Sequence, residues 1–344
     1  MQLQNSFLIT RFITVSKAVT NSKIPVVVIF APTATGKTAL TRELFSEKGS
    51  HFIFKAQIIS ADSQCVYKGL DIGTAKPDAA LLQEIPHHLV NILSPDKQFN
   101  VSDFVDMADE ACRKIWERGE LPVVCGGTGF YIRNFLYGVP KTPESDSKLR
   151  EELKQRIAVE GNAALYEELK KVDPESAQKI HLNDAYRICR ALEVFYLSGK
   201  SRTSFKLEPK LRENYNFLFV VLKPEREVLY ERIHARVDQM FNDGLEKEID
   251  GLRRAGYGKD SPGLKAIGYS EWFEPVEGDA AQNHKEYIEN VKAAIKHHSC
   301  KYAKKQFTYI KDIPGSIVLP YSGSDADLAT AAQKIQTFVS EFWA

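Results

Sequence analysis

The apolar and polar positions of this chain follow two alternating patterns, one typical of buried strands and one typical of amphipathic helices. Short apolar runs rich in β-branched residues predict strands at 26–30, 57–61, 121–125, 215–222 and, as an edge strand, 316–320. Apolar residues spaced three or four positions apart predict helices at 38–45, at 101–118, at roughly 225–254 and after the last strand. This order predicts an α/β fold, a parallel-sheet core with helices on both faces.

One long segment interrupts the alternation. Residues 141–212 are highly charged, show helical periodicity and contain no strand-like run. Within the segment, Asn183 and Asp184 are expected to cap a helix. We therefore predict a smaller all-helical insertion domain at 141–212, within a P-loop core domain formed by residues 24–140 and 213–344.

The N-terminal residues 1–23 precede the first predicted strand. They contain no acidic residue, several serines and threonines, and three basic residues. This composition resembles an organellar transit peptide. A flexible extension without a targeting role is the alternative, and we favour it.

The composition narrows the classes to which the protein can belong. A chain of 344 residues with 43% hydrophobic and 26% charged residues is long enough for a full core and two domains. A net charge of +1 gives no overall attraction to nucleic acid, so any RNA contact must come from local patches. Five cysteines without CxxC spacing favour a reducing compartment over disulfides or a zinc site. No apolar run approaches the ~18 residues of a membrane span.

The first predicted strand leads into a pattern typical of phosphate-binding loops. Residues 31–38 match the P-loop consensus, except that Ala31 replaces its first glycine. Main-chain N–H groups of such a loop bind phosphate oxygens, Lys37 adds a positive charge, and the Thr38 hydroxyl is a Mg²⁺ ligand. A tight turn with a surface lysine is the alternative. The predicted phosphate-binding residues are Ala31, Pro32, Thr33, Ala34, Thr35, Gly36, Lys37 and Thr38.

Two further segments are expected at the same edge of the sheet, because ligands of open α/β sheets lie at the carboxyl ends of the strands. Asp62 follows the second strand and could act as a general base or organise Mg²⁺. A helix N-cap is the alternative for Asp62. A glycine cluster at 126–129 follows the third strand and would let the main chain approach a ligand closely.

Two basic features could contact phosphate groups. Arg232 and Arg236 lie one turn apart on a predicted helix, a spacing that suits pyrophosphate. Residues 291–306 include five lysines, two histidines and no acid, and aromatic residues lie nearby. This stretch is the best candidate for contact with an RNA backbone. A solvated helix surface is the alternative for both features.

Several separated blocks together resemble bacterial tRNA dimethylallyltransferases. The most specific is Asp-Ile-Gly-Thr-Ala-Lys-Pro at 71–77. The blocks occur in the order of that family, and they occupy 32–38, 59–63, 66–77, 86–89, 126–131, 183–194, 198–200, 266–269 and 302–306. The resemblance therefore extends from the phosphate loop almost to the last predicted strand.

The resemblance implies a reaction in which a dimethylallyl group passes from dimethylallyl diphosphate to N6 of the adenosine 3′-adjacent to the anticodon of a tRNA, with release of pyrophosphate. The P-loop would bind the diphosphate leaving group rather than ATP. The implied catalytic residues are Asp62 as general base, Thr38 as ligand of the cofactor Mg²⁺, and Arg236 as the diphosphate-binding arginine. A P-loop small-molecule or nucleotide kinase is the main alternative, and a non-catalytic RNA-binding module is the second.

The resemblance also implies the partners of the protein. The insertion domain would bind the tRNA anticodon stem-loop, and the protein would act as a cytoplasmic monomer without membrane contact. The implied tRNA-binding residues are Asp62, Ser63, Gln64, Cys65, Thr128, Arg150, Tyr186, Arg187, Ile188, Cys189, Arg190, Leu264, Lys265, Ala266, Ile267, Gly268, Tyr269, Lys301, Lys304, Lys305 and Gln306.

Six residues, at four places in the chain, depart from the common family pattern. Besides Ala31, these are Gln64-Cys65 beside the expected general base, Ser299-Cys300, and Lys305 in place of a common arginine. Lysine lacks the bidentate fork of arginine, so we expect a weaker phosphate contact at Lys305.

Overall fold

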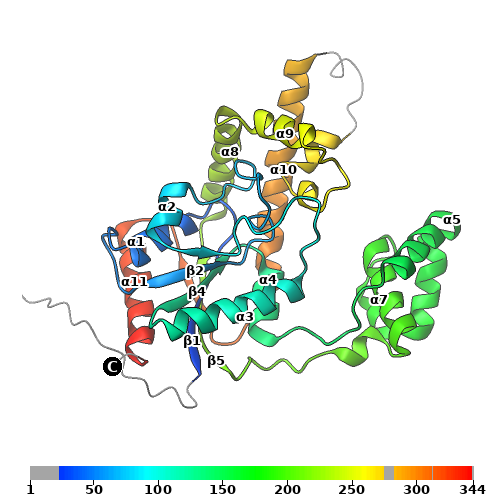
Figure 1. Cartoon of the computed structure of the whole chain (residues 1–344), viewed down its shortest axis with the longest axis horizontal. Helices are drawn as coiled ribbons and strands as arrows, with labels where there is room; N and C mark the ends of the chain where they lie inside the picture. The colour runs from blue at the N-terminus through cyan, green and yellow to red at the C-terminus, as the bar shows by residue number, and fades with distance from the viewer. Residues whose placement is uncertain (1–22, 275–282, 312, 343–344) are drawn as a thin grey trace, which may run out of the picture. The chain divides into compact units, whose positions relative to one another are not determined.

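The computed structural model describes residues 23–274, 283–311 and 313–342 (Figure 1). The N-terminal extension expected at 1–23 lies outside the described residues, except for Lys23. The chain divides into two compact units. Residues 137–211 form one, which we call the insertion unit, and the described residues before and after them form the other, the core unit.

The core unit contains a sheet in which all six described strands are parallel, in the order β3-β2-β4-β1-β5-β6. The strands are β1 (Ile24–Phe30), β2 (Ala56–Ser60), β3 (His87–His88), β4 (Leu121–Gly126), β5 (Tyr215–Lys223) and β6 (Ile317–Pro320). The apolar runs predicted every strand except β3, whose two histidines are too few to form a pattern. The predicted parallel sheet is confirmed, and β6, the last strand along the chain, lies at its edge as predicted.

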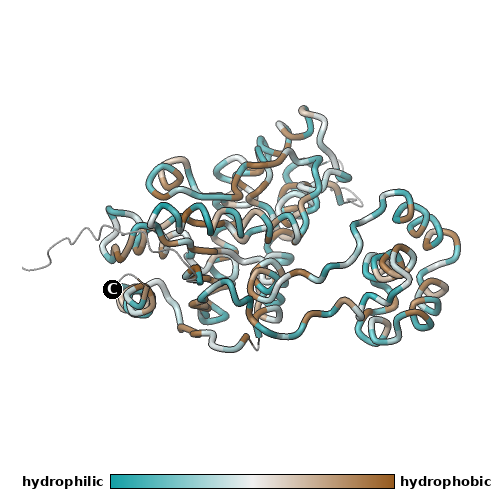
Figure 2. Tube along the Cα trace, turned by 60° about the horizontal axis from the view of Figure 1, so that its bottom comes forward, coloured by the Kyte–Doolittle hydropathy of each residue, from teal (hydrophilic) through white to brown (hydrophobic). Residues whose placement is uncertain are grey.

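Helices cover both faces of this sheet, as the sequence predicted. Val27 and Ile29 of β1 pack on the face covered by α1 (Lys37–Phe45) and α11 (Asp325–Ser340). The neighbouring residues of a strand point to the opposite face, where α3 (Val101–Glu117), α4 (Gly129–Tyr137) and α10 (His284–Ile310) lie. Along many helices in Figure 2, hydrophilic and hydrophobic colours alternate, as expected for elements with one buried side.

The helix predicted at 225–254 is in fact two helices, α8 (Arg226–Asn242) and α9 (Leu245–Arg254). Gly244 lies between them with φ of 99°, a left-handed conformation that glycine adopts easily and that interrupts the helix. The prediction of one helix was wrong because the apolar spacing continues across the break. The shorter elements of the core unit are α2 (Ala79–Glu84), η2 (Pro262–Lys265) and η3 (Ser270–Phe273).

The insertion unit is entirely helical, and all its residues are described. Its helices are α5 (Ser147–Val172), α6 (Pro174–Lys179), α7 (Ala185–Ser198) and η1 (Arg202–Phe205). They enclose a separate apolar core that includes Leu153, Leu165 and Leu192. Asp184 caps α7, as predicted, since its carboxylate accepts a hydrogen bond from the main-chain N–H of Arg187 at 3.2 Å.

The chain leaves the core unit and returns to it at nearly the same point. The main-chain N–H of Arg212 donates to the carbonyl oxygen of Leu136, 3.0 Å away. The Arg212 guanidinium also pairs with the carboxylate of Asp109 on α3, which accepts a further hydrogen bond from the Tyr215 hydroxyl. Leu136 and Arg212, the two core-unit residues that flank the insertion unit, are thus hydrogen-bonded to each other.

Candidate active site

Three loops meet at the carboxyl edge of the sheet, because they follow the neighbouring strands β2, β4 and β1. The loop after β2 is tied to the loop after β4 by hydrogen bonds from Thr128 N to Ala61 O (3.0 Å) and from Ser63 N to the Thr128 hydroxyl (3.0 Å). A Cβ atom at Gly126 would lie 2.1 Å from Ala61 O, so this approach requires glycine. The glycine cluster therefore serves close packing between two loops.

The loop at 31–36 connects β1 directly to α1, the strand–loop–helix order that the P-loop pattern requires. Helix α1 begins at Lys37, directly after Gly36, which has φ of 100°. The first loop residue, Ala31, is fully buried and is absent from the positions with positive φ. A side chain is tolerated at this position, so Ala31 does not disturb the loop.

The Lys37 side chain folds back over its own loop. Its ammonium group donates to the carbonyl oxygens of Ala31 (2.9 Å) and Pro32 (2.8 Å). Burial lowers the pKa of Lys37, and the nearby Cys125 and Asp62 oppose this effect. The positive charge of the loop thus lies within electrostatic range of the Asp62 carboxylate.

Asp62 lies in the turn after β2 and is half-buried. Its Oδ1 accepts a hydrogen bond from the main-chain N–H of Gln64 at 2.9 Å, which forms an Asx turn. In the described part of the chain, no helix begins at Asp62, so the N-cap alternative does not apply. The turn fixes one carboxylate oxygen and leaves the other available to accept a proton.

The two arginines of α8 have different partners. Nη2 of Arg236 donates to the carbonyl oxygen of Thr74 at 3.3 Å, and Nη2 of Arg232 donates to that of Ser322 at 2.6 Å. Burial lowers the pKa of Arg236, while the charge of Asp62 raises it. Arg236 is therefore near enough to Asp62 for their charges to interact.

Residues 71–76 form a loop beside Arg236, and this loop is held by side chains that include one far away in the sequence. The main-chain N–H groups of Asp71, Ile72 and Gly73 donate to the carboxylate of Glu248 on α9 at 2.9, 2.8 and 3.2 Å. The ammonium group of Lys76, 3% exposed, contacts the Asp71 carboxylate at 2.8 Å. The family resemblance marked residues 71–77, but the role of Glu248 was missed because nothing local to α9 indicates this contact.

Helix α10 contributes Gln306, which is 3% exposed. Its Nε2 donates to Gly127 O at 2.6 Å, and its Oε1 accepts from Thr33 N at 3.3 Å. The resemblance implied a tRNA contact at Gln306, and in the structure its side chain joins the loop after β1 to the loop after β4.

The basic stretch on α10 is only partly free. Lys292 and Lys296 both pair with Asp238 of α8 at 2.7 Å, so two of the five lysines already have an anionic partner. Lys301, Lys304 and Lys305 are exposed. These three remain candidates for contact with an RNA backbone.

The expected tRNA-binding residues of the core unit differ in exposure. Ser63 and Gln64 are half-buried beside Asp62, and Cys65 is 6% exposed. In the segment 264–269 only Lys265 is fully exposed; Leu264, Ala266, Gly268 and Tyr269 are buried and Ile267 is half-buried. Burial raises the pKa of Cys65, so its thiol stays protonated at neutral pH.

Inside the insertion unit, Ile188 and Cys189 belong to the apolar core, so their side chains face inward. Tyr186 is 71% exposed and Arg187 is also exposed. Within 186–190, the side chains of Tyr186 and Arg187 are thus exposed, and that of Arg190 is half-buried.

Arg190 and Arg150 both pair with Glu193, whose side chain is 1% exposed. The Glu193 carboxylate also accepts from the Ser145 hydroxyl at 2.6 Å and from Asp146 N at 2.9 Å. Burial raises the pKa of Glu193, but these hydrogen bonds and charges outweigh burial and hold the pKa below its ordinary value of 4.5. Both arginines thus have a structural partner within the unit.

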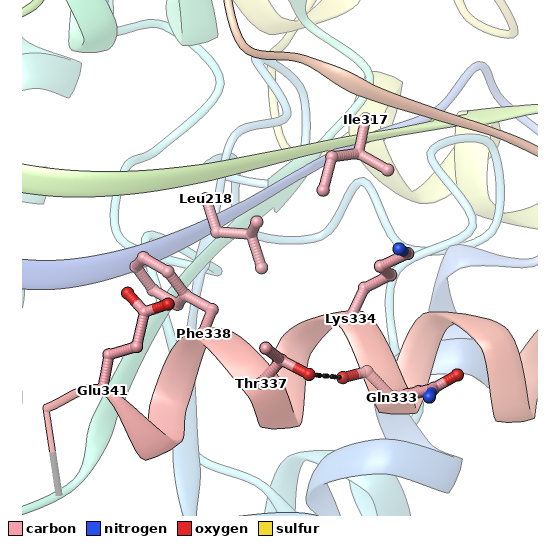
Figure 3. Close-up of a pocket in the computed structure, with 7 residues that line it drawn as sticks. All are labelled: Leu218, Ile317, Gln333, Lys334, Thr337, Phe338 and Glu341. Atoms are coloured by element: carbon pink, nitrogen blue, oxygen red, sulfur yellow. Dashed lines mark hydrogen bonds between the residues drawn. The ribbon is translucent and has the colours of Figure 1, made fainter.

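A separate hollow lies between α11 and the sheet (Figure 3). Ile317 is the first residue of β6, so the hollow is toward the amino-terminal end of the strands, away from Asp62. Its lining contains no cluster of catalytic groups: Leu218, Ile317, Gln333, Lys334, Thr337, Phe338 and Glu341. We do not assign it a ligand.

Two features are absent from the part of the chain that the structure describes. No helix there is long and apolar enough to cross a membrane. Nor do those residues include a group of three histidine, cysteine, aspartate or glutamate side chains placed to hold a metal ion.

Comparison with known proteins gives consistent matches in sequence. A family model described as IPP transferase matches residues 65–313. The tRNA dimethylallyltransferase of Geobacter sulfurreducens is 36% identical over 314 residues, which cover 91% of this chain and 97% of that protein. The tRNA dimethylallyltransferase 2 of Geotalea uraniireducens is 40% identical over 288 residues, which cover 83% of this chain and 89% of that protein.

Solved structures agree with these matches. The full-length tRNA isopentenylpyrophosphate transferase from Bacillus halodurans aligns with a TM-score of 0.62 and 33% identity, covering 93% of this chain and 97% of that one. A eukaryotic dimethylallyltransferase acting on tRNA aligns with a TM-score of 0.76 and 27% identity, covering 93% of this chain and 80% of that one. The similarity thus extends over most of this chain and of each relative.

Proposed function

The chain belongs to the IPP transferase family, and we propose that it transfers a dimethylallyl group from dimethylallyl diphosphate to N6 of the adenosine 3′-adjacent to the anticodon in tRNA, with release of pyrophosphate. The observation that carries this proposal is the position of Asp62. Its carboxylate is within electrostatic range of both Lys37 of the phosphate loop and Arg236 of α8. A proton acceptor and a diphosphate site therefore lie together at one edge of the sheet.

The phosphate loop would bind the diphosphate of the donor. The main-chain N–H groups at the start of α1 can bind an anion, the Lys37 ammonium group lies over the loop, and Arg236 approaches from α8. To bind phosphate, Lys37 would exchange its contacts with Ala31 O and Pro32 O for contacts with phosphate oxygens. These groups stabilise the charge that collects on the departing pyrophosphate.

The donor set fits Mg²⁺ as a cofactor. Thr38 is exposed at the start of α1 and offers a hydroxyl oxygen, a hard ligand suited to this ion. The remaining ligands would be diphosphate oxygens and water, since Mg²⁺ in phosphate sites keeps several waters and substrate oxygens. Bound there, Mg²⁺ would neutralise charge on the diphosphate.

The acceptor needs a base because the lone pair of the adenine N6 amine is delocalised into the ring. Asp62 would take a proton from N6 as the N6–carbon bond forms, while the carbon–oxygen bond to the diphosphate breaks and its electron pair leaves with pyrophosphate. The target adenosine must leave the base stack to reach Asp62. Tyr302 on α10 is exposed and its hydroxyl group is within electrostatic range of Asp62, so its ring would contact the extruded base.

Exposed basic and aromatic side chains would bind the rest of the RNA. Lys301, Lys304 and Lys305 on α10 would contact phosphates, and Tyr186 and Arg187 of the insertion unit would contact the anticodon stem-loop. We further propose that the protein acts as a monomer in the cytoplasm, where its RNA substrate occurs.

The proposal is tested by incubating the full chain with Mg²⁺, dimethylallyl diphosphate and an unmodified anticodon stem-loop. One dimethylallyl group should be added per RNA, on an adenosine, with release of pyrophosphate. Lys37→Ala should chiefly raise the donor concentration required, because it removes a charge that binds diphosphate.

A parallel incubation with ATP in place of the prenyl donor tests the kinase alternative. The comparisons favour the transferase, so no phosphorylated RNA or small molecule is expected. A phosphorylated product from ATP, with no prenylated RNA from dimethylallyl diphosphate, would overturn the proposal.

A further inference from the structure

The carboxylate of Glu248 lies outside the group of residues to which the proposed reaction assigns a role, yet it has four hydrogen-bond donors. Three are the consecutive main-chain N–H groups of residues 71–73, and the fourth is the Tyr269 hydroxyl at 2.6 Å from Oε1. A carboxylate that accepts several N–H hydrogen bonds is strongly held and in turn fixes the donors. The conformation of the 71–73 segment therefore depends on a residue about 175 positions away.

The Tyr269 ring packs on the same loop. A Cβ atom at Gly73 would lie 2.6 Å from this ring, so only glycine allows the ring to lie against the main chain there. Tyr269 is fully buried, and burial together with the Glu248 charge raises the pKa of its hydroxyl. Tyr269 thus remains a neutral donor to Glu248, and the two side chains hold the loop from one side.

Lys76 holds the loop from the other side. Its ammonium group donates to the carboxylate of Asp71 at 2.8 Å and to the side-chain oxygen of Asn91 at 2.7 Å. The Thr74 hydroxyl closes the loop internally by donating to Leu70 O at 2.6 Å. Fixed on both sides, the loop has little freedom to move its carbonyl groups.

One of those carbonyl groups orients Arg236. Thr74 O accepts from Nη2 of Arg236 at 3.3 Å, directly after the three residues that Glu248 holds. The same guanidinium is within electrostatic range of Asp62, so its direction decides whether it reaches the diphosphate site. A shift of the loop would move this carbonyl and release the guanidinium.

We propose that Glu248 is a positioning residue of this enzyme: it fixes residues 71–74, so that the Thr74 carbonyl directs Arg236 toward the diphosphate beside Asp62. This inference rests on the proposed function, which identifies the diphosphate as part of the substrate. Glu248 is also in the first turn of α9, where a negative charge favours the helix. That helix effect alone would act equally at Glu246, which is also in the first turn and pairs with His284.

Binding of inorganic pyrophosphate to the full chain, measured by calorimetry, is the primary test. Glu248→Gln keeps the size of the side chain but places an amide donor against main-chain donors. This variant should bind pyrophosphate on the order of tenfold more weakly, because a displaced binding group costs about this much or more. The matched variant Glu246→Gln should bind like the unchanged protein. Equal weakening in both variants would overturn the proposal.

A double variant separates positioning from a general loss of structure. If Glu248 acts through Arg236, then Glu248→Gln should add less than about twofold to the effect of Arg236→Ala, because coupled residues are not additive. Full additivity of the two changes would overturn the proposal. If Glu248→Gln does not fold, Tyr269→Phe takes its place in the same cycle, since it removes one donor and keeps the ring.

Steady-state kinetics then give a second readout. Glu248→Gln should raise the KM for dimethylallyl diphosphate on the order of tenfold and leave the KM for the RNA unchanged. Equal changes in both KM values would contradict the positioning role. If the unchanged protein prenylates no RNA, the proposed function has failed, and the pyrophosphate measurements still decide for or against the role of Glu248.

Discussion

The side-chain amide of Gln306 donates a hydrogen bond to the carbonyl oxygen of Gly127, 2.6 Å away. The other end of the same amide accepts from the main-chain N–H of Thr33, so one side chain of α10 joins the phosphate loop to the loop after β4. Lys304 and Lys305 lie on the same turn of α10 and are exposed. The helix proposed to contact RNA is therefore bonded directly to the loop proposed to bind the donor.

Gln306→Ala should destabilise the protein by about 1 to 3 kcal/mol for each main-chain group left buried without a partner. Gln306→Glu should also destabilise it, because the carboxylate can still accept from Thr33 N but would lie against the carbonyl oxygen of Gly127. Thermal unfolding of both variants checks this, with the exposed Lys304→Ala as control. Unfolding temperatures equal to that of the control would show that the contacts of Gln306 contribute nothing.

Asp62→Asn should fold normally, because the asparagine Oδ1 can still accept from Gln64 N. It should lose turnover by roughly 10²- to 10⁴-fold, since an amide cannot serve as a general base. Single-turnover measurements with saturating donor and RNA check this, together with a binding assay that should show unchanged affinity for tRNA. Asp62→Ala should lose turnover similarly. Unchanged turnover in either variant would exclude Asp62 as the base.

Arg236→Ala should weaken binding of dimethylallyl diphosphate on the order of tenfold or more, because it removes a charge near the diphosphate. Arg232→Ala is the matched control: it lies one turn earlier on α8, but its guanidinium reaches Ser322 O instead. Titration of the prenyl donor against both variants separates them. A larger effect at Arg232 than at Arg236 would reverse the assignment.

Thr38→Ala should raise the Mg²⁺ concentration needed for half-maximal activity on the order of tenfold, because a hydroxyl ligand is lost. Removal of Mg²⁺ by a chelator should abolish turnover in the unchanged protein, and added Mg²⁺ should restore it. Thr38→Ser keeps the hydroxyl and should behave like the unchanged protein. If alanine and serine variants share one Mg²⁺ dependence, Thr38 is not a ligand.

Glu193→Gln should destabilise the insertion unit by about 3 kcal/mol at neutral pH, because it leaves Arg150 and Arg190 without their anionic partner. The pKa of Glu193 lies below its ordinary value of 4.5 in the folded protein. The stability that the ionised Glu193 carboxylate contributes is therefore complete above that value, and it is lost as the pH falls through the folded pKa.

Urea unfolding of the unchanged protein and of Glu193→Gln, at about pH 7 and at about pH 4 and below, checks both the size and the pH dependence. The difference in stability between the two proteins should shrink at the acidic end. A difference that stays constant over this range would show that the carboxylate is not the group responsible.

Much of the fold and of the site could be predicted because the signals are local. A strand of a parallel sheet is buried on both faces, so its apolar run is continuous, and the residues that follow it must lie at the ligand edge. This reasoning placed Lys37 and Asp62 correctly at one edge of the sheet. The resemblance, rather than the spacing, selected Arg236 over Arg232.

What could not be predicted depends on contacts between distant residues. No pattern near Glu248 indicates that its carboxylate binds residues 71–73, and none near Gln306 indicates its contact with Gly127. The pairing of Lys292 and Lys296 with Asp238 was missed for the same reason, since their charge alone suggested a free basic surface. The single residue Gly244 divided a continuous apolar spacing into two helices.

The hydrogen bond from Arg212 N to Leu136 O closes the core unit at the point where the insertion unit departs. The insertion unit, residues 137–211, is therefore not needed for the sheet to close around its own core. Deleting residues 137–211 and joining Leu136 to Arg212 through a tight turn should leave a core unit that still folds. Grafting the corresponding segment of a relative at the same junction would then exchange RNA preference while keeping the chemistry of the donor.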